Sequence, residues 1–178
     1  MKIVKRVLLV AAIIIAIPLI AALFLKKDYS VECEIMINKP KQEVFDYVKY
    51  LKNQNEYSKW GRMDPNMKTT YVGEDGMAGF IFKWEGNAES GKGEEEIKKI
   101  INGERIDYEL RFTEPMTSTF QSYMITESVS ENVTNVKWGM TGRMNYPMNL
   151  MLLFIDTQKM LGDDFNTGLL NLKNKLEG

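Results

Sequence analysis

The feature that most constrains the fold is the long region after Gly61, in which apolar and polar residues alternate. A period of two residues is typical of β-strands that bury one face. Short turn sequences separate the alternating segments: Gly-Glu-Asp-Gly at 73–76, Gly-Asn at 86–87, Asn-Gly at 102–103, Glu-Pro at 114–115 and Ser-Glu-Asn at 130–132. Strands joined by consecutive short turns pair as antiparallel neighbours. The pattern predicts six strands, at 67–74, 78–85, 89–101, 105–113, 118–129 and 133–143.

A seventh strand and the helices of the domain are predicted on either side of this region. Residues 29–38 alternate and form the first strand. Asn38 and Pro40 suit the start of an amphipathic helix that runs to about Lys52, and a short helix follows at 54–60. Residues 147–176 are helical, with one segment ending at Gly162 and the next capped by Asp163 or Asp164. The order predicts an α+β fold in which a curved antiparallel sheet of seven strands wraps around a long C-terminal helix.

An apolar segment precedes the domain. Val7 to Leu25 contains 19 residues without a charge, which span about 28 Å as a helix, close to the thickness of a bilayer's hydrocarbon core. We expect a retained transmembrane anchor at 1–27 and a domain at 28–178. A cleaved secretory signal and a buried soluble helix are the alternatives, but bulky residues and lysines follow the apolar run where a cleavage site needs small ones. The basic residues before the run favour a cytoplasmic N-terminus and a domain on the outer side of the membrane.

The amino-acid composition excludes several classes of function. The chain has no histidine and a single cysteine, Cys33, which excludes catalysis by Ser-His-Asp or Cys-His groups and zinc sites with histidine ligands. The formal net charge of −1 gives no basic surface for nucleic acid. We therefore predict no metal, no cofactor and no nucleic-acid partner. An enzyme built from this chain would have to use carboxylates, tyrosines, lysines, arginines or bound water.

Several local motifs, taken in order, carry a resemblance to a known superfamily. They are Asn-Lys-Pro-Lys-Gln-Glu-Val-Phe-Asp-Tyr-Val at 38–48, Tyr-Ser-Lys-Trp at 57–60, Trp-Glu-Gly at 84–86 with Gly-Lys-Gly-Glu at 91–94, Val-Lys-Trp at 136–138 and Met-Leu-Gly-Asp-Asp-Phe at 160–165 with Gly-Leu-Leu-Asn-Leu-Lys at 168–173. Over residues 29–177 the chain resembles the SRPBCC superfamily of START-like and polyketide cyclase-like proteins. The resemblance implies a helix-grip fold with a pocket between the sheet and the C-terminal helix. It implies no catalytic residue, because the superfamily includes ligand carriers, cyclases, hydrolases and chaperone co-factors.

Strand parity predicts which side chains face that pocket. Successive residues of a strand point to opposite faces, so Phe80, Phe82 and Trp84 lie on one face. The complete set predicted to line a site for a small hydrophobic ligand is Trp60, Phe80, Phe82, Trp84, Glu95, Tyr108, Phe112, Tyr123, Trp138, Met140 and Phe165. Aromatic and methionine side chains suit an apolar ligand. The alternative is that these side chains only fill a core.

Glu95 is the polar exception in this set. Parity places it on the same face as Ile97, whereas a bulge near Gly91 and Gly93 would turn it to solvent. An inward carboxyl would have a raised pKa and could serve as an acid, a base or a ligand anchor. The leading hypothesis is a membrane-tethered binding or carrier protein for a lipid or polyketide-like molecule. The alternatives are a cyclase or dehydratase that uses Glu95 with a tyrosine, and an envelope interaction or stress module with a vestigial cavity.

Overall fold

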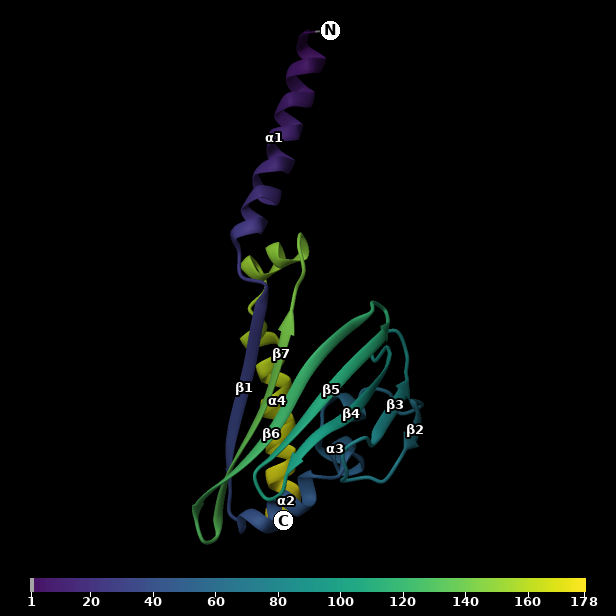
Figure 1. Ribbon diagram of the computed structural model, residues 1–178, viewed down its shortest axis with the longest axis vertical. Coiled ribbons are helices and arrows are strands. Elements are labelled where there is room, and N and C mark those ends of the chain that lie inside the picture. The colour runs from purple at the N-terminus through teal and green to yellow at the C-terminus, as the bar shows by residue number, and fades with distance from the viewer. Residues whose placement is uncertain (1) are drawn as a thin grey trace.

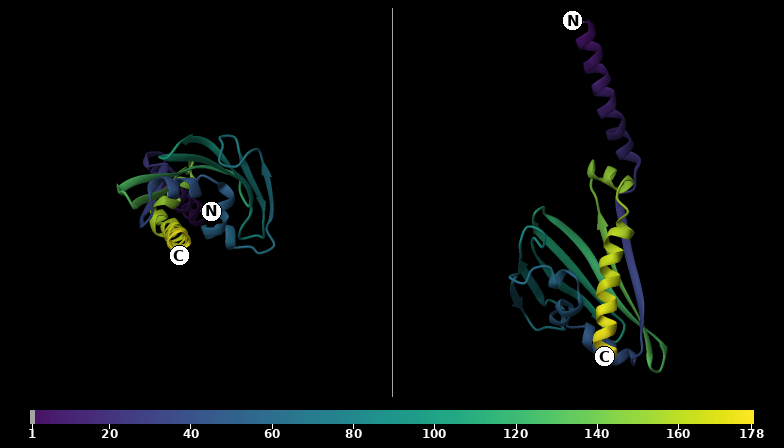
Figure 2. Two further views of the ribbon diagram at one scale, coloured as in Figure 1. Left: turned by 90° about the horizontal axis from the view of Figure 1, so that it is seen from below. Right: turned by 180° about the vertical axis from the view of Figure 1, so that it is seen from behind.

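The computed structural model describes residues 2–178 and contains a single antiparallel sheet in the order β1-β7-β6-β5-β4-β3-β2 (Figure 1). All neighbouring strands pair antiparallel, and every pair except β1 and β7 is adjacent in sequence. The sheet curves around the helices that follow β1 and around the C-terminal helix (Figure 2). The strands are β1 Asp28–Ile37, β2 Lys68–Val72, β3 Ile81–Glu85, β4 Lys92–Ile101, β5 Arg105–Glu114, β6 Ser118–Ser130 and β7 Val133–Arg143. The predicted α+β fold with seven strands is confirmed.

Two strands begin later than the alternation predicts, because glycine-rich turns extend into them. Asn87 accepts hydrogen bonds at its Oδ1 from the backbone N–H groups of Glu89 (2.9 Å) and Ser90 (3.0 Å). Gly91 then takes a φ of 64°, a left-handed conformation that glycine adopts without strain. These contacts keep residues 87–91 in a turn, so β4 starts at Lys92. Gly79, at a φ of 90°, delays β3 in the same way.

The helices after β1 are shorter than predicted. They are α2 Lys41–Val48, α3 Leu51–Tyr57 and the single 3₁₀ turn η1 Trp60–Arg62. The predicted continuous helix to Lys52 is wrong, because Tyr50 is extended and the carboxylate of Asp75 accepts hydrogen bonds from the backbone N–H groups that open α3. The predicted cap at Asn38 is also wrong, since α2 begins at Lys41 after Pro40 and has no side-chain cap.

The C-terminal helix α4 Thr157–Glu177 is continuous, which corrects the break predicted at Gly162. Its N-terminus is capped by Asp156, which accepts a hydrogen bond of 2.9 Å from the Lys159 backbone N–H. Gly162 is buried in the helix interior, and a Cβ built on it would lie 3.6 Å from the sulfur of Cys33 in β1. A contact of that length is ordinary van der Waals packing, and the helix continues through Gly162 beside β1. The preceding residues form the separate 3₁₀ helix η2 Met148–Leu153.

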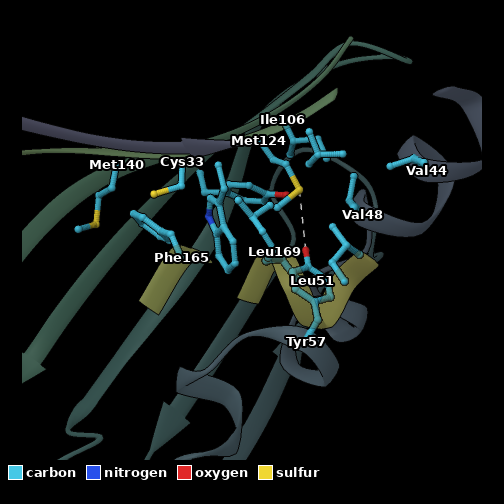
Figure 3. Close-up of a cluster of buried hydrophobic side chains, with 14 of the residues drawn as sticks. Cys33, Val44, Val48, Leu51, Tyr57, Ile106, Met124, Met140, Phe165 and Leu169 are labelled. Atoms are coloured by element: carbon cyan, nitrogen blue, oxygen red, sulfur yellow. Dashed lines mark hydrogen bonds between the residues drawn. The ribbon is translucent and has the colours of Figure 1, made fainter. Parts of the chain in front are cut away.

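The core lies between α4, the first strand and the short helices, and α4 packs mainly along β1 rather than across the whole concave face. Figure 3 shows Phe165 and Leu169 of α4 pointing toward the sheet, and both side chains are buried. The helices α2 and α3 close the end of the sheet that is farthest from the N-terminus (Figure 1). Val44, Phe45, Val48 and Leu51 are almost completely buried there.

The helix α1 Lys2–Phe24 projects away from the domain, at the end opposite α2 (Figure 1). Within the described residues it is the one helix that is long and apolar enough to cross a membrane. Nearly all of its side chains are exposed, so it is not a core helix of the domain. An N-terminal signal sequence meets the same criteria of length and apolar composition.

Candidate functional site: the inner face of the sheet

A chain of aromatic rings lines the inner face over β3, β5 and β6. The ring centroids of Trp84 and Phe112 lie 5.3 Å apart with edge-to-face geometry, and those of Phe112 and Phe120 lie 5.8 Å apart. Phe82 stacks on Trp84 at 5.8 Å. Gly93 of β4 makes room for this arrangement, because a Cβ at that position would lie 2.7 Å from the indole of Trp84. The predicted inward direction of Phe82, Trp84 and Phe112 agrees with this packing.

A second aromatic cluster joins the sheet to α4 and η1. The ring of Phe165 lies 5.3 Å from that of Trp60 and 5.0 Å from that of Trp138, measured between centroids. Trp60 and Trp138 meet edge-to-face at 6.0 Å. Met140 follows Trp138 on the inner face of β7 and is buried. Trp138 and Met140 therefore lie on the inner face of β7, as the alternation indicates.

The inner face is closed at one end and more open at the other. Phe80, Ile106 and Tyr108 are almost fully buried near α2 and α3. Leu110, Phe112 and Phe120 are only half-buried, and they lie toward the turn that joins β5 to β6. That turn is at the same end of the domain as α1 (Figure 1).

Glu95 points inward from the middle of β4, where its cross-strand neighbours are Phe82 and Leu110. The register shifts at Lys92/Gly93 and Ile97/Lys99 flank this stretch without turning Glu95 outward. Its side chain is 5 % exposed. The neighbouring carboxylates Glu94 and Glu96 lie on the outer face, where both accept hydrogen bonds of 2.8 Å from Arg111. In the acidic triplet, Glu94 and Glu96 are thus paired with Arg111 on the outer face, and Glu95 alone is buried.

Burial raises the pKa of Glu95 to about 7, because a charged carboxylate loses its hydration in this apolar environment. One hydrogen bond opposes the shift: the amide Nε2 of Gln54 in α3 donates to Glu95 Oε2 over 2.9 Å. Near neutral pH the carboxyl is therefore about half protonated and half ionised. A group with such a pKa can bind a polar ligand atom as a donor or as an acceptor.

Two more polar atoms beside Glu95 have no hydrogen-bond partner within the described chain. They are the Oε1 atom of Gln54 and the hydroxyl of Tyr108, and both are buried. Burying a polar atom without a partner costs about 1–3 kcal/mol. The nearby hydroxyl of Tyr57 donates only to the sulfur of Met124, at 3.9 Å (Figure 3). Burial raises the pKa values of the Tyr57 and Tyr108 phenols well above the ordinary value, and the Glu95 charge raises them further.

Tyr123 does not belong to this group, which corrects its predicted inward position. In β6 the inward residues are Phe120, Ser122 and Met124, so Tyr123 lies on the outer face. Its hydroxyl donates a hydrogen bond to the Glu32 carboxylate, and the guanidinium of Arg105 lies 4.3 Å from its ring centre. Partial burial and the bonded carboxylate raise its pKa to about 12.

Gln54 and Tyr57 were not among the predicted site residues. Both lie on α3, a helix of seven residues whose composition is mostly polar. Its length is too short for a periodic apolar pattern to show which side faces the core. The only sequence signal was the resemblance at Tyr57 and Trp60, and it did not indicate direction.

Two surface hollows lie away from this inner face. One, of about 430 Å³, is lined by residues of β1, β6 and β7 that include Tyr29, Gln121 and Arg143. The other, of about 460 Å³, lies at the sheet edge beside Asp64, Lys68 and Asn87. Neither is lined by a residue that the sequence predicted for the pocket.

Comparisons with known proteins show the fold. No protein-family model matches the chain, and no curated protein matches it either. Among solved structures, a norcoclaurine synthase point mutant from Thalictrum flavum in complex with a transition-state analogue matches with a TM-score of 0.59 and 10% identity, covering 83% of this chain and 96% of that one. Ara h 8.0201 matches with a TM-score of 0.56 and 13% identity, covering 84% and 97%. The Aha1 dimer from Colwellia psychrerythraea matches with a TM-score of 0.56 and 16% identity, covering 84% and 96%.

Proposed function

The chain has the helix-grip fold of these proteins, and we propose that it is a membrane-tethered binding protein for a small hydrophobic molecule with one polar end. The ligand lies along the inner face of the sheet, against the rings of Trp84, Phe112 and Phe120. Lipids and polyketide-like molecules have this chemistry. The anchor at 1–27 holds the domain of residues 28–178 beside the bilayer, where such ligands partition.

The observation that carries the proposal is the buried polar group formed by Glu95, Gln54 and Tyr108. Polar atoms in a protein interior are nearly always hydrogen-bonded. Here the Tyr108 hydroxyl is a free donor and Gln54 Oε1 is a free acceptor, close to a carboxyl that exchanges its proton near pH 7. A hydroxyl at the end of an apolar ligand can both donate and accept, and would satisfy these atoms.

The open end of the inner face supports the same reading. The half-buried side chains of Leu110, Phe112 and Phe120 continue from the buried polar group toward the end where α1 leaves the domain. A ligand that enters there would place its apolar part against the aromatic rings and its polar end against Glu95. Entry at this end also brings the ligand directly from the membrane surface.

The test is to identify what the detergent-solubilised full chain carries after purification, by native mass spectrometry and by extraction of bound lipids. Tyr108→Phe and Tyr123→Phe form a matched pair, because each removes one phenolic hydroxyl, from the inner and the outer face respectively. We expect Tyr108→Phe to lower retention of the bound molecule and to weaken binding of the neutral apolar fluorophore N-phenyl-1-naphthylamine. Equal behaviour of both variants and the parent chain would contradict a site at Glu95.

A second candidate function is acid–base catalysis on such a ligand. One observation favours it: a carboxyl with a pKa of about 7 is suited to donate and accept protons at neutral pH. Conversion of a bound molecule by the parent chain, and its loss in Glu95→Gln, would establish an enzyme. Binding without conversion would establish a carrier.

The basic residues before the apolar run support a cytoplasmic N-terminus with the domain on the outer side of the membrane. Protease protection in right-side-out and inverted vesicles tests this orientation directly. Digestion of the domain only in inverted vesicles would place it on the cytoplasmic side and overturn the proposed topology.

A further inference from the structure

The segment between β7 and α4 exposes apolar side chains on the surface of the domain. From Met144 to Ile155 no side chain is charged. Phe154 is 86 % exposed and Leu153 is 59 % exposed, and Met148, Met151 and Tyr146 are also exposed. Exposed apolar residues gathered in one segment mark an interaction site more often than isolated ones do. We call residues 146–154 the η2 platform.

The η2 platform is attached to the end of the apolar helix. Asn149 is fully buried, and its side-chain Nδ2 donates to the carbonyl oxygen of Ala22 over 2.7 Å and to that of Leu25 over 3.4 Å. Ala22 lies in the last turn of α1 and Leu25 follows directly after the helix, so neither carbonyl has a helical N–H group to bind it. Ala22 is itself fully buried, whereas its neighbours along α1 are exposed. A second link joins the Met144 backbone N–H to the Lys27 carbonyl oxygen at 2.8 Å.

These contacts fix the depth of the η2 platform if α1 spans a bilayer. Leu25 is the last residue of the uncharged run, and Ala22 precedes it by about 4.5 Å along a helix. The platform therefore sits beside the boundary between acyl chains and headgroups. Amphipathic elements that lie in this boundary bury their apolar side to about 5–10 Å. Figure 1 shows η2 as a short turn beside the base of α1, on the side of the domain that faces it.

The charges around the segment fit the same position. Lys26, just after α1, and Lys159, in the first turn of α4, are exposed, and Lys27 is half-buried. Asp28 is paired with Arg143 at 3.2 Å, and Asp156 is engaged by the backbone at the start of α4. Free lysine side chains beside an apolar surface can reach the phosphates of lipid headgroups.

We propose that the η2 platform is a second membrane contact, which inserts into the headgroup boundary of the bilayer that α1 spans and is held against α1 by Asn149. The proposal rests on the retained anchor proposed above. The two contacts together prevent the domain from swinging freely on its tether. They also hold the open end of the inner face, at the turn between β5 and β6, toward the lipid.

The test measures depth in the full chain, reconstituted in nanodiscs of phosphatidylcholine and phosphatidylglycerol. A nitroxide label is placed on Phe154→Cys, Ile14→Cys or Glu131→Cys, each in a Cys33→Ala background. Collisions of the label with oxygen and with a polar nickel chelate report its position. We expect the label at 14 to be deep, the label at 131 to be in water, and the label at 154 to contact oxygen more than nickel.

Each other result has a separate meaning. A label at 154 that behaves like the label at 131, while the label at 14 is deep, would overturn the platform and leave the anchor intact. A label at 154 shielded from both oxygen and nickel would show that protein, not lipid, covers the segment. If the label at 14 is in water, the anchor itself is refuted.

Asn149→Ala tests the link to α1, with Asn145→Ala as the matched control. Asn145 is exposed and lies four residues earlier in the same segment. We expect Asn149→Ala to move the label at 154 toward water without changing the label at 14, and Asn145→Ala to change neither. An unchanged label at 154 in Asn149→Ala would refute the role of Asn149 in holding the platform.

Discussion

Glu95 links the fold to the proposed site, and its substitution by glutamine has an effect that can be calculated. Burial raises the pKa of this carboxyl from an ordinary value of 4.5 to about 7. The folded state therefore holds one proton more than the unfolded chain between these two pH values. Each added proton in the folded state makes the free energy of unfolding fall as the pH rises. The total loss across the interval is about 3 kcal/mol.

Glu95→Gln removes this titration and keeps the shape of the side chain. Near pH 4 the carboxyl is neutral in both states, so the variant and the parent should differ by no more than about 1 kcal/mol, the worth of one hydrogen bond. At pH 8 the parent carries the cost of a buried charge and the variant does not. We expect the variant to be more stable there by about 3 kcal/mol, which raises the melting temperature by about 6–12 °C.

The assay is thermal unfolding of the full chain in detergent between pH 4 and pH 8, followed by near-ultraviolet circular dichroism of the tryptophans. Other carboxylates change stability in both proteins alike, so the difference between variant and parent isolates Glu95. Glu131→Gln is the control, because Glu131 is exposed in the turn between β6 and β7. A difference that is constant over this pH range would refute the burial of Glu95 and remove the central group of the proposed site.

Four further predictions follow from the packing and the anchor. Phe165→Ala should destabilise the domain by about 3–5 kcal/mol in thermal melts, because a buried ring is lost from the contact between α4 and the sheet; an unchanged melt would contradict this contact. Gly162→Leu should cost about 1–3 kcal/mol in the same assay by forcing α4 away from β1, and a neutral effect would mean that the helix can shift freely. Hydrogen bonds from Lys83 and Arg111 lower the pKa of Glu94, so the ionised carboxylate stabilises the fold and this contribution is lost when Glu94 is protonated. Arg111→Met should therefore lower the free energy of unfolding more at pH 7 than at pH 4, and equal losses at both pH values would refute this contribution. The full chain should stay with membranes in carbonate and a chain beginning at Asp28 should be released, whereas a mature N-terminus near residues 24–28 in cells would show that α1 is a cleaved signal.

Much of the sheet was predictable because its signals are local. Antiparallel strands joined by short turns keep their alternation in register, so parity alone gave the inward direction of Trp84 and Trp138. Parity also placed Glu95 correctly, since the two register shifts of β4 lie on either side of it. It failed at Tyr123 because β6 carries apolar residues on both faces, and the sequence does not show which set meets the core.

The helical parts were less predictable because tertiary contacts decide them. Glycine is common just after a helix end, but Gly162 lies in the interior of α4, where the helix packs beside Cys33 of β1. The division between α2 and α3 depends on Asp75, a residue more than twenty positions later in the chain. A single sequence contains no local signal for a cap that arrives from another loop.

Two buried polar side chains, Asn149 and Glu95, differ in the groups that they bind. The amide Nδ2 of Asn149 binds the Ala22 carbonyl oxygen of α1 and so links the helix to the domain, while its buried Oδ1 has no partner within the described chain. Glu95 binds only Gln54, and the atoms around it that lack partners are a donor and an acceptor of the site itself. An apolar residue at position 95 would stabilise the fold more at neutral pH, because no charge would be buried. Under the proposed function, the carboxyl serves ligand binding at the expense of stability, and the hydrogen bonds of Asn149 to α1 would keep the open end of the site toward the membrane.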